Sequence, residues 1–272
     1  MKKFLIILFL IIIFMGVYIF FINTTGFKIV EDAIAIQDLP ESFEDFKIVQ
    51  FSDFLIGSTK NVDDIENVVK EINSLEPDLI VFTGDLIASD YSVNEDDVTS
   101  LKKHLSSLDC TLYKYAIIGD NDAKNLDLYK EILNDSGFVL LDNQSTYIFY
   151  KDINPIKLTG ITDISDIESA LYMSDELSTV FNIVLTHQPD NIEQIANYDV
   201  DLVLAGHSLL GQVRIPFWGG VIKKDGARTY LDHHYTINDT QLYVSAGLGT
   251  DNNINIRAFN KPTINLYRLQ KK

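Results

Sequence analysis

The chain has 272 residues, of which 46% are hydrophobic and 22% are charged. This length and balance are typical of a folded protein with one large or two small domains, and they exclude an extensively disordered chain. The formal net charge of −17 disfavours nucleic acid as a partner, because so acidic a surface repels phosphate backbones. The single cysteine, Cys110, excludes an intrachain disulfide.

The N-terminus carries Lys2 and Lys3 and then an uncharged apolar run over residues 4–22. About 20 helical residues cross a bilayer, so the run predicts one transmembrane helix. A cleaved signal peptide is the competing interpretation, but the run ends in Phe20-Phe21-Ile22-Asn23 and offers no small-residue cleavage site. We therefore expect residues 1–23 to be a short cytoplasmic N-terminus and a membrane anchor. The protein would be single-pass in the cell membrane, with its remaining residues outside the cytoplasm.

From residue 24 onward, strand and helix patterns alternate. Strands are expected at 27–38, 47–52, 78–83, 112–119, 139–141, 146–150, 156–161, 180–186, 200–205, 242–245, 254–259 and 263–269. Helices are expected at 62–75, 96–108, 126–133 and 167–171. The alternation predicts an α/β domain with a largely parallel sheet, and the β-rich second half predicts a second sheet packed on the first. We expect residues 24–272 to form one domain.

Polar residues follow five of the expected strands. They are Asp53, Asp85, Asp120, His187 and His207. One such Asp is usually a turn or helix cap, and a lone His is more often a hydrogen-bonded structural group. Five of them at strand ends indicate a shared site, because sites of open α/β sheets lie beyond the carboxyl ends of the strands. Carboxylates and imidazoles together are ligands for Zn, Mn or Fe.

The order Asp…Gly-Asp…Gly-x-x-Asp…His…Gly-His resembles the calcineurin-like metallophosphoesterase family over about residues 47–269. The stretches "AGHSLLGQVRIPFWG", "TQLYVSAGLGT" and "IRAFNKPTINL" resemble the membrane-anchored bacterial branch of that family. The resemblance implies a four-layer fold in which two mixed β-sheets pack face to face and are flanked by helices. Residues 24–272 would then be a calcineurin-like phosphoesterase domain that follows one N-terminal transmembrane helix.

The resemblance also implies two metal positions. One would use Asp53, Leu55, Asp85 and Leu209, where the family has histidine in place of both leucines. The other would use Asp85, Asp120, His187 and His207, all of which can ligate, with Asp120 in place of an asparagine. Asn121 stands where the family has the histidine that protonates the leaving group. We therefore expect a degenerate dinuclear site that retains one divalent Mn, Zn or Fe ion and lacks two ligands of the second.

Three functions stay open at this point. The chain is a mononuclear phosphoesterase acting on a phosphomonoester, a diester or a lipid-linked pyrophosphate. Alternatively, it is an inactive pseudo-phosphoesterase that binds a small ligand or a protein partner. In the third interpretation the polar residues only hydrogen-bond to one another.

Five further residues have two interpretations each. His233 and His234 belong to an exposed loop or replace a lost ligand. Trp218 lines a substrate mouth or simply packs. Arg214 and Arg257 reach a phosphate or pair with acidic neighbours.

Overall fold

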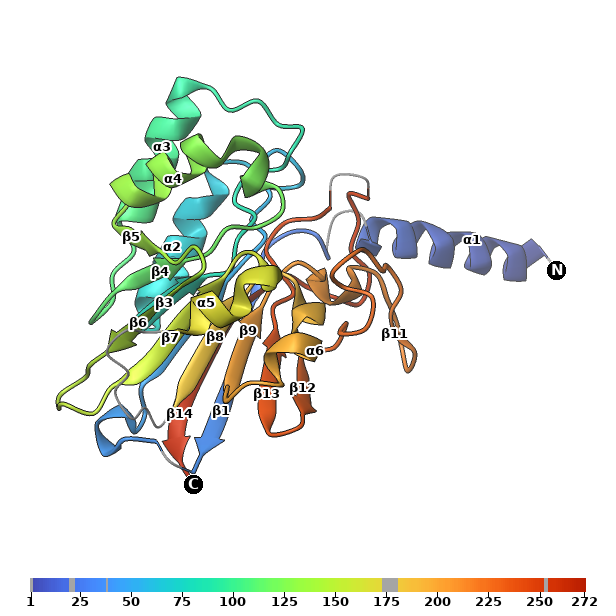
Figure 1. The fold of residues 1–272 in the computed structure, drawn as a ribbon. Helices are drawn as coiled ribbons and strands as arrows, with labels where there is room; N and C mark the ends of the chain where they lie inside the picture. The colour runs from blue at the N-terminus through green and yellow to red at the C-terminus, as the bar shows by residue number, and fades with distance from the viewer. Residues whose placement is uncertain (1, 20–22, 38, 173–180, 252–253) are drawn as a thin grey trace.

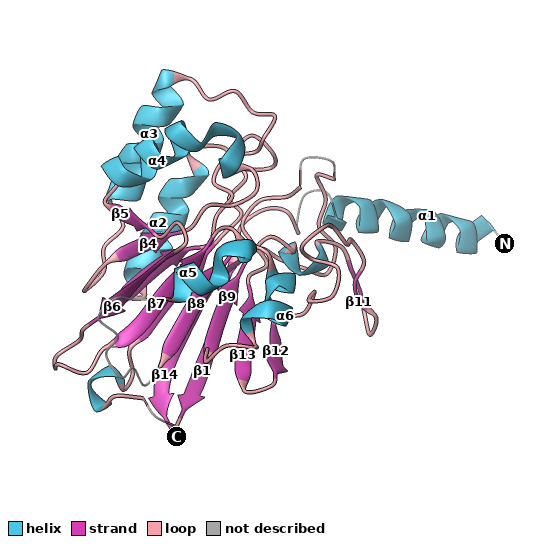
Figure 2. Ribbon diagram, viewed as in Figure 1, coloured by secondary structure: helices cyan, strands magenta, loops and turns pink. Residues whose placement is uncertain are grey.

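The computed structural model describes residues 2–19, 23–37, 39–172, 181–251 and 254–272. Within them, two six-stranded β-sheets pack face to face and helices cover both outer faces (Figure 1, Figure 2). The apolar residues between the sheets form a core that includes Ile48, Val81, Ile183 and Leu204. The predicted architecture of two mixed sheets flanked by helices is therefore present.

The first sheet has the strand order β1-β14-β2-β3-β4-β5. Only β14 and β2 pair antiparallel within it, so the sheet is mixed. Its strands are β1 (Lys28–Ile36), β2 (Lys47–Phe51), β3 (Leu79–Phe82), β4 (Lys114–Ala116), β5 (Phe138–Leu140) and β14 (Thr263–Lys271).

The second sheet has the order β12-β13-β9-β8-β7-β6. Its outermost pairs are antiparallel and its inner pairs are parallel. Its strands are β6 (Gln144–Ile148), β7 (Ile156–Ile161), β8 (Asn182–Thr186), β9 (Leu202–Ala205), β12 (His234–Ile237) and β13 (Thr240–Val244). A separate two-stranded ribbon consists of β10 (Arg214–Ile215) and β11 (Gly219–Gly220).

Helices α2 (Asp64–Ser74), α3 (Glu95–Ser106) and α4 (Leu126–Asp135) cover the outer face of the first sheet (Figure 1). The amphipathic spacing of α2 explains its place, since Ile65, Val68, Val69 and Ile72 are its buried residues. The short helices α5 (Ile167–Leu171) and α6 (Ile192–Ile195) cover the second sheet. The layers therefore run helix, sheet, sheet, helix.

The expected transmembrane helix is not present as predicted. Helix α1 spans Lys2–Val17 and has 16 residues, which corresponds to about 24 Å of length against a hydrocarbon core of about 30 Å. Among the described residues no helix has both the length and the apolar character that a membrane crossing requires. The prediction of a span over residues 4–22 is therefore wrong for the part of it that the structure describes, and residues 20–22 lie outside that part.

Several elements differ from the sequence-based expectation. Residues 254–259 are not a strand: their one ladder contact is an isolated bridge between Val213 and Ala258, and the Ile256 amide bonds locally to the Ile254 carbonyl. The strand expected over residues 180–186 is β8, which begins at Asn182. Residue 180 lies outside the described residues. The pattern did not predict β10, β11, β12 or α6, because two- to four-residue elements carry too little periodicity.

Candidate metal centre

The carboxyl ends of the central strands meet at one edge of the two sheets. In the first sheet Phe51 of β2 pairs with Phe82 of β3, so that the chain continues from there to Asp53 and Asp85. In the second sheet Thr186 of β8 pairs with Ala205 of β9 just before the two histidines. The Asp53 carboxylate joins the sheets, since its Oδ2 accepts the backbone N–H of His207 at 3.0 Å.

Three of the five predicted ligands converge. Asp85, His187 and His207 each offer one ligand atom, and these atoms all lie within 4.8 Å of one another. His187 Nε2 is 3.3 Å from Asp85 Oδ2 and 3.3 Å from His207 Nδ1. All three side chains are buried. Two imidazoles and a carboxylate aimed at a common point are a donor set that fits a divalent transition metal.

The outer nitrogens of both histidines are held by backbone carbonyls. His187 Nδ1 lies 2.7 Å from the Thr83 carbonyl oxygen, and His207 Nε2 lies 2.7 Å from the Asp225 carbonyl oxygen. A carbonyl oxygen only accepts, so each of these nitrogens carries the proton and donates it. When the imidazoles are neutral, the opposite nitrogens, which face Asp85 and each other, therefore have lone pairs that a cation can take. Outer hydrogen bonds of this kind orient metal-bound histidines.

The electrostatics of the triad favour a positive charge at its centre. Burial by itself would lower the pKa of His187, but the Asp85 carboxylate raises it to about 10. Burial also opposes ionisation of Asp85, yet the charge of His187 brings its pKa below the ordinary range. Burial and the His187 charge lower the pKa of His207 to about 4. In the metal-free chain a proton on His187 thus takes the place that the geometry offers to a cation.

Asp120 lies at the rim of the triad. Its carboxylate is half exposed, and its Oδ2 is 3.4 Å from His207 Nδ1. Gln188 Nε2 donates to both Asp120 oxygens at 3.0 Å. A cavity of about 330 Å³ opens here, lined by Asp120, His187, Gln188, Asn191 and Thr162 among others. The centre is therefore reachable from solvent on this side.

Asp53 does not belong to the converging triad, although it contacts the backbone of His207. Its carboxylate is buried, burial raises its pKa, and Oδ1 has no hydrogen-bond partner among the described residues. Gly247 separates it from Leu209: a Cβ at this position would lie 2.5 Å from Leu209 Cδ2 and 2.8 Å from Asp53 Cβ. Asp53 is therefore a neighbour of Leu209 across Gly247.

Leu55 and Leu209 lie side by side. Leu55, Leu209 and Ala88 form a buried apolar cluster, with 3%, 1% and 1% of their surface exposed. None of their side chains can coordinate a cation. We refer to Leu55, Ala88 and Leu209 as the apolar half of the centre, and to Asp85, His187 and His207 as the polar half.

The backbone of both halves is unusual in the same way. Asp53, Leu55, Asp85, His207 and Leu209 all have left-handed conformations, with φ between 48° and 63°. Residues other than glycine seldom adopt this region, and such strain gathers at functional sites. The left-handed conformation thus occurs in both halves, at Asp85 and His207 and at Leu55 and Leu209.

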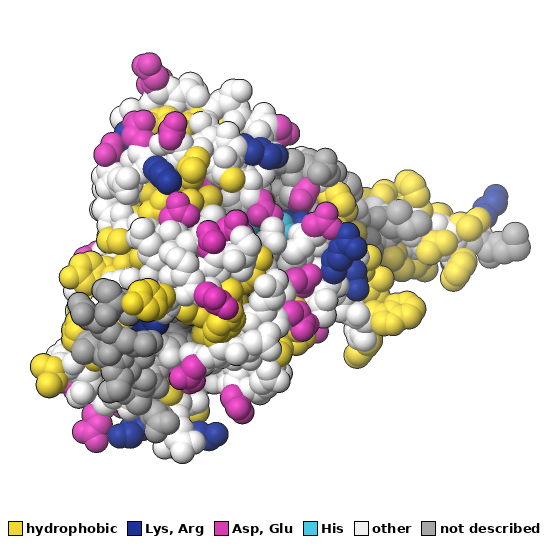
Figure 3. Space-filling view, in the orientation of Figure 1, with side chains coloured by type: hydrophobic (Ala, Val, Ile, Leu, Met, Phe, Trp, Pro, Cys, Tyr) yellow, Lys and Arg dark blue, Asp and Glu magenta, His cyan; other side chains and the backbone are white. Residues whose placement is uncertain are grey.

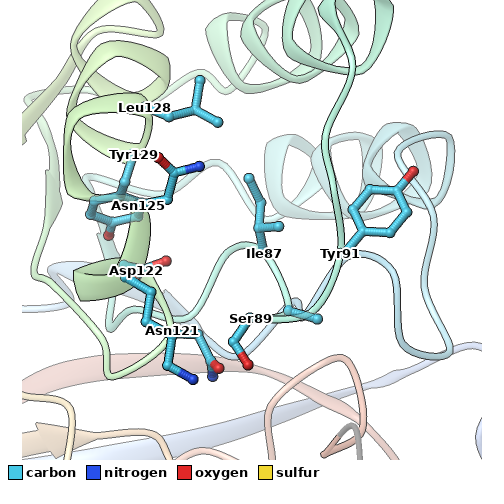
Figure 4. Close-up of a pocket in the computed structure, with 10 residues that line it drawn as sticks. Ile87, Ser89, Tyr91, Asn121, Asp122, Asn125, Leu128 and Tyr129 are labelled. Carbon is cyan, nitrogen blue, oxygen red and sulfur yellow. The ribbon is translucent and has the colours of Figure 1, made fainter.

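Asn121 and Asp122 fix the position of Asp85. The Asn121 side-chain amide donates to Asp85 Oδ2 and its backbone N–H donates to Oδ1 at 2.8 Å. Asp122, which sequence reasoning left without a role, accepts the N–H groups of Asp85 and Leu86 at 2.7 Å and 2.9 Å. Figure 4 shows Asn121 and Asp122 on one wall of a cavity of about 180 Å³, across from Ile87 and Tyr91.

The remaining candidate residues lie elsewhere. His233 Nε2 is 2.8 Å from Asp32 Oδ2, and His234 stands on β12 against Tyr243, so neither replaces a lost ligand here. Trp218 is 86% exposed on the turn between β10 and β11. Arg214 pairs with Asp232, whereas Arg257 is buried and donates to the carbonyls of Ala246 and Gly249. Arg214 thus pairs with an acidic neighbour as one interpretation predicted, whereas the hydrogen bonds of Arg257 go to backbone carbonyls instead.

The comparisons with known proteins agree with this fold. The family model described as calcineurin-like phosphoesterase matches residues 46–210. An uncharacterized metallophosphoesterase of Bacillus subtilis, YkuE, is 32% identical over 85% of this chain and 82% of its own length. An uncharacterized metallophosphoesterase of Helicobacter pylori is 30% identical over 82% of this chain and 58% of its own length. The phosphodiesterase YaeI of Escherichia coli is 26% identical over 64% of each chain.

The chain belongs to the calcineurin-like phosphoesterase family.

Proposed function

We propose that the protein is a metal-dependent phosphoesterase that works with one divalent ion, held by Asp85, His187 and His207 and bordered by Asp120. The observation that supports this most is the convergence of two imidazole nitrogens and one carboxylate. Hydrogen bonds to backbone carbonyls orient the two histidines, and a hydrogen bond from the Asn121 amide orients Asp85. Zn, Mn and Fe suit this donor set. When bound, such an ion would polarise a phosphoryl oxygen and promote the ionisation of a water molecule.

The residues around the ion position have separate tasks in this proposal. Asn121 holds both oxygens of Asp85, so its amide is a positioning group rather than a proton donor to a leaving group. No imidazole takes that donor role at position 121, and the loss of a general acid typically costs about 10²–10⁴-fold in rate. Esters with acidic leaving groups, which depart without a proton, are therefore the substrates to expect.

A phosphodiester is the first substrate class to test. The similar protein from E. coli carries the name phosphodiesterase, and the cavity of about 330 Å³ beside His187 leaves room for an ester group. The experiment is the hydrolysis of bis(p-nitrophenyl) phosphate by the full chain, loaded with increasing Mn²⁺. We expect activity to rise until one ion is bound per chain and to vanish with a chelator. Metal-independent hydrolysis, or none with one ion bound, contradicts the proposal.

One observation favours a second function, a pseudo-phosphoesterase that binds a phosphorylated ligand without turnover. The Leu55, Ala88 and Leu209 cluster closes the half of the centre that would hold a second ion, and a symmetric two-metal clamp is then absent. The same experiment separates the two functions, because a pseudoenzyme would take up one ion and bind phosphate while releasing no p-nitrophenol.

A further inference from the structure

A tight turn after the β10–β11 ribbon is attached to the metal centre. Lys224 and Ala227 exchange two backbone hydrogen bonds, at 3.4 Å and 3.0 Å, and Gly226 between them has a left-handed φ of 77°. The carbonyl oxygen of Asp225 in this turn accepts the Nε2–H of His207 at 2.7 Å. The turn therefore sets the orientation of a predicted ligand, and it is itself held in place.

A second anchor fixes the same turn. The backbone N–H of Asp190 donates to the Gly226 carbonyl at 3.0 Å, and the Asp190 carboxylate accepts the N–H of Arg228 at 2.7 Å. The side chain of Gln188 lies so close to Gly226 that a Cβ there would be 2.4 Å away. Hydrogen bonds thus hold the turn on both flanks.

Two successive lysines at this turn differ in their exposure. Lys223 is exposed, whereas Lys224 is half-buried and its Nζ lies 3.8 Å from Asp251 Oδ2. The segment before Asp251 packs on the apolar half, since Gly249 lies against Leu55. Figure 3 shows Lys and Arg side chains next to histidine atoms on this face.

The charge of Lys224 acts on the centre. Burial has the largest influence on the pKa of Asp53, Asp85 and His207, and the positive charges of His187 and Lys224 lower all three. The contacts agree with this, because Lys224 extends from the turn that holds His207 to Asp251, in the segment that packs on Leu55.

A charge count shows what this ammonium would do for a substrate. The carboxylates of Asp53, Asp85 and Asp120 carry three negative charges when ionised, and one divalent ion leaves one of them unbalanced. A phosphate ester would then approach a net negative site. An ammonium group binds phosphate as a point charge and removes this repulsion.

We propose that Lys224 binds the phosphoryl group of the substrate beside the single metal ion, and so supplies positive charge that the apolar half cannot hold. The inference rests on the proposed function, because it assigns Lys224 to the same centre. The ligand class is an anionic phosphoryl group with free oxygens. The salt bridge to Asp251 stands at 3.8 Å, at the limit of such contacts, and leaves ammonium protons for a phosphate oxygen.

The test uses the full chain and the variants Lys224→Met, Lys224→Arg and Lys223→Met, the last as the matched exposed control. Manganese content is measured first, and the binding of inorganic phosphate to the manganese-loaded protein follows by calorimetry. We expect Lys224→Met to keep its metal and to bind phosphate about 10–100-fold more weakly, as for loss of a hydrogen bond to a charged group. Lys224→Arg should retain most of the affinity, and Lys223→Met should match the wild type.

The outcomes separate this inference from the proposed function. Equal phosphate affinity of Lys224→Met and wild type, an equal loss in Lys223→Met, or no phosphate binding by the wild type would overturn the role of Lys224. A wild-type chain that takes up no metal contradicts the proposed function. In that case, phosphate binding that still weakens only in Lys224→Met would support the lysine as an anion-binding residue.

Discussion

The polar and apolar halves of the centre both contain residues in a left-handed backbone conformation, but they differ in their side chains. Around Asp85, His187 and His207, the donor atoms converge within 4.8 Å and their outer faces are fixed by hydrogen bonds. Around Leu55 and Leu209 the backbone is left-handed in the same way, but hydrocarbon fills the space. The comparison teaches that strand ends and left-handed turns build the frame of such a centre, while a few side chains determine whether donor atoms or hydrocarbon fill it.

The largest effect is expected from breaking the polar half. Asp85→Asn removes the one carboxylate in the triad, and we expect bound metal to be lost. Loss of a residue that only hydrogen-bonds to a metal ligand lowers metal affinity by about 10–100-fold, and we expect a larger decrease here. Metal per chain, measured by mass spectrometry after equilibration with Mn²⁺, checks this. Asp152→Asn, on an exposed loop, is the control. Unchanged metal content in Asp85→Asn would refute the assignment of the centre.

The comparison can also be reversed by making the apolar half polar. The double variant Leu55→His with Leu209→His adds two imidazoles next to Asp53 and Asp85, and we expect metal content to rise from about one to about two ions per chain. Each single variant should stay near one ion, since a position with too few ligands binds weakly. A folded double variant, as judged by circular dichroism, that still binds one ion would contradict the idea that these leucines alone exclude the second.

Removing hydrocarbon from the apolar half should affect stability rather than metal. Leu209 is 1% exposed and packs on Leu55 and Ala88, so we expect Leu209→Ala to lower the free energy of unfolding by about 2–5 kcal/mol. Urea denaturation measures this, with Val139→Ala as the control because Val139 is 45% exposed. A loss below about 1 kcal/mol would show that the apolar half is not part of the packed core.

The smallest effect is expected from the groups that position Asp85. Asn121→Ala removes the amide that donates to Asp85 Oδ2, and metal affinity should fall about 10–100-fold while the ligands remain. A Mn²⁺ titration monitored by calorimetry gives the dissociation constant. Asn125→Ala is the control, because Asn125 lines the same cavity (Figure 4). An equal effect in both variants would point to a general disturbance of the cavity instead.

Much of the fold could be predicted from the sequence because its elements carry strong periodic patterns. Helix α2 and strands β2 and β3 were expected within two residues of their observed ends. The strand-end positions of Asp85, His187 and His207 followed from the same patterns. The expected transmembrane helix failed because an apolar composition fixes neither where a helix ends nor whether it continues, and α1 ends at Val17.

The parts of the centre that the sequence did not reveal come from distant loops. The turn at Lys224 and Asp225 has no motif, and its contact with His207 depends on how the segment after β11 folds back. Asp120 looked equivalent to the other ligands in sequence, yet it lies at the rim, where Gln188 binds it. Such details depend on tertiary packing, which local patterns do not encode.

The number of metal ions per chain tests the account most directly. A calorimetric titration of the full, metal-free chain with Mn²⁺ should show one binding site, which Asp85→Asn abolishes. A stoichiometry of two would contradict the view that Leu55 and Leu209 close one half of the centre. A stoichiometry of zero would contradict the role given to Asp85, His187 and His207.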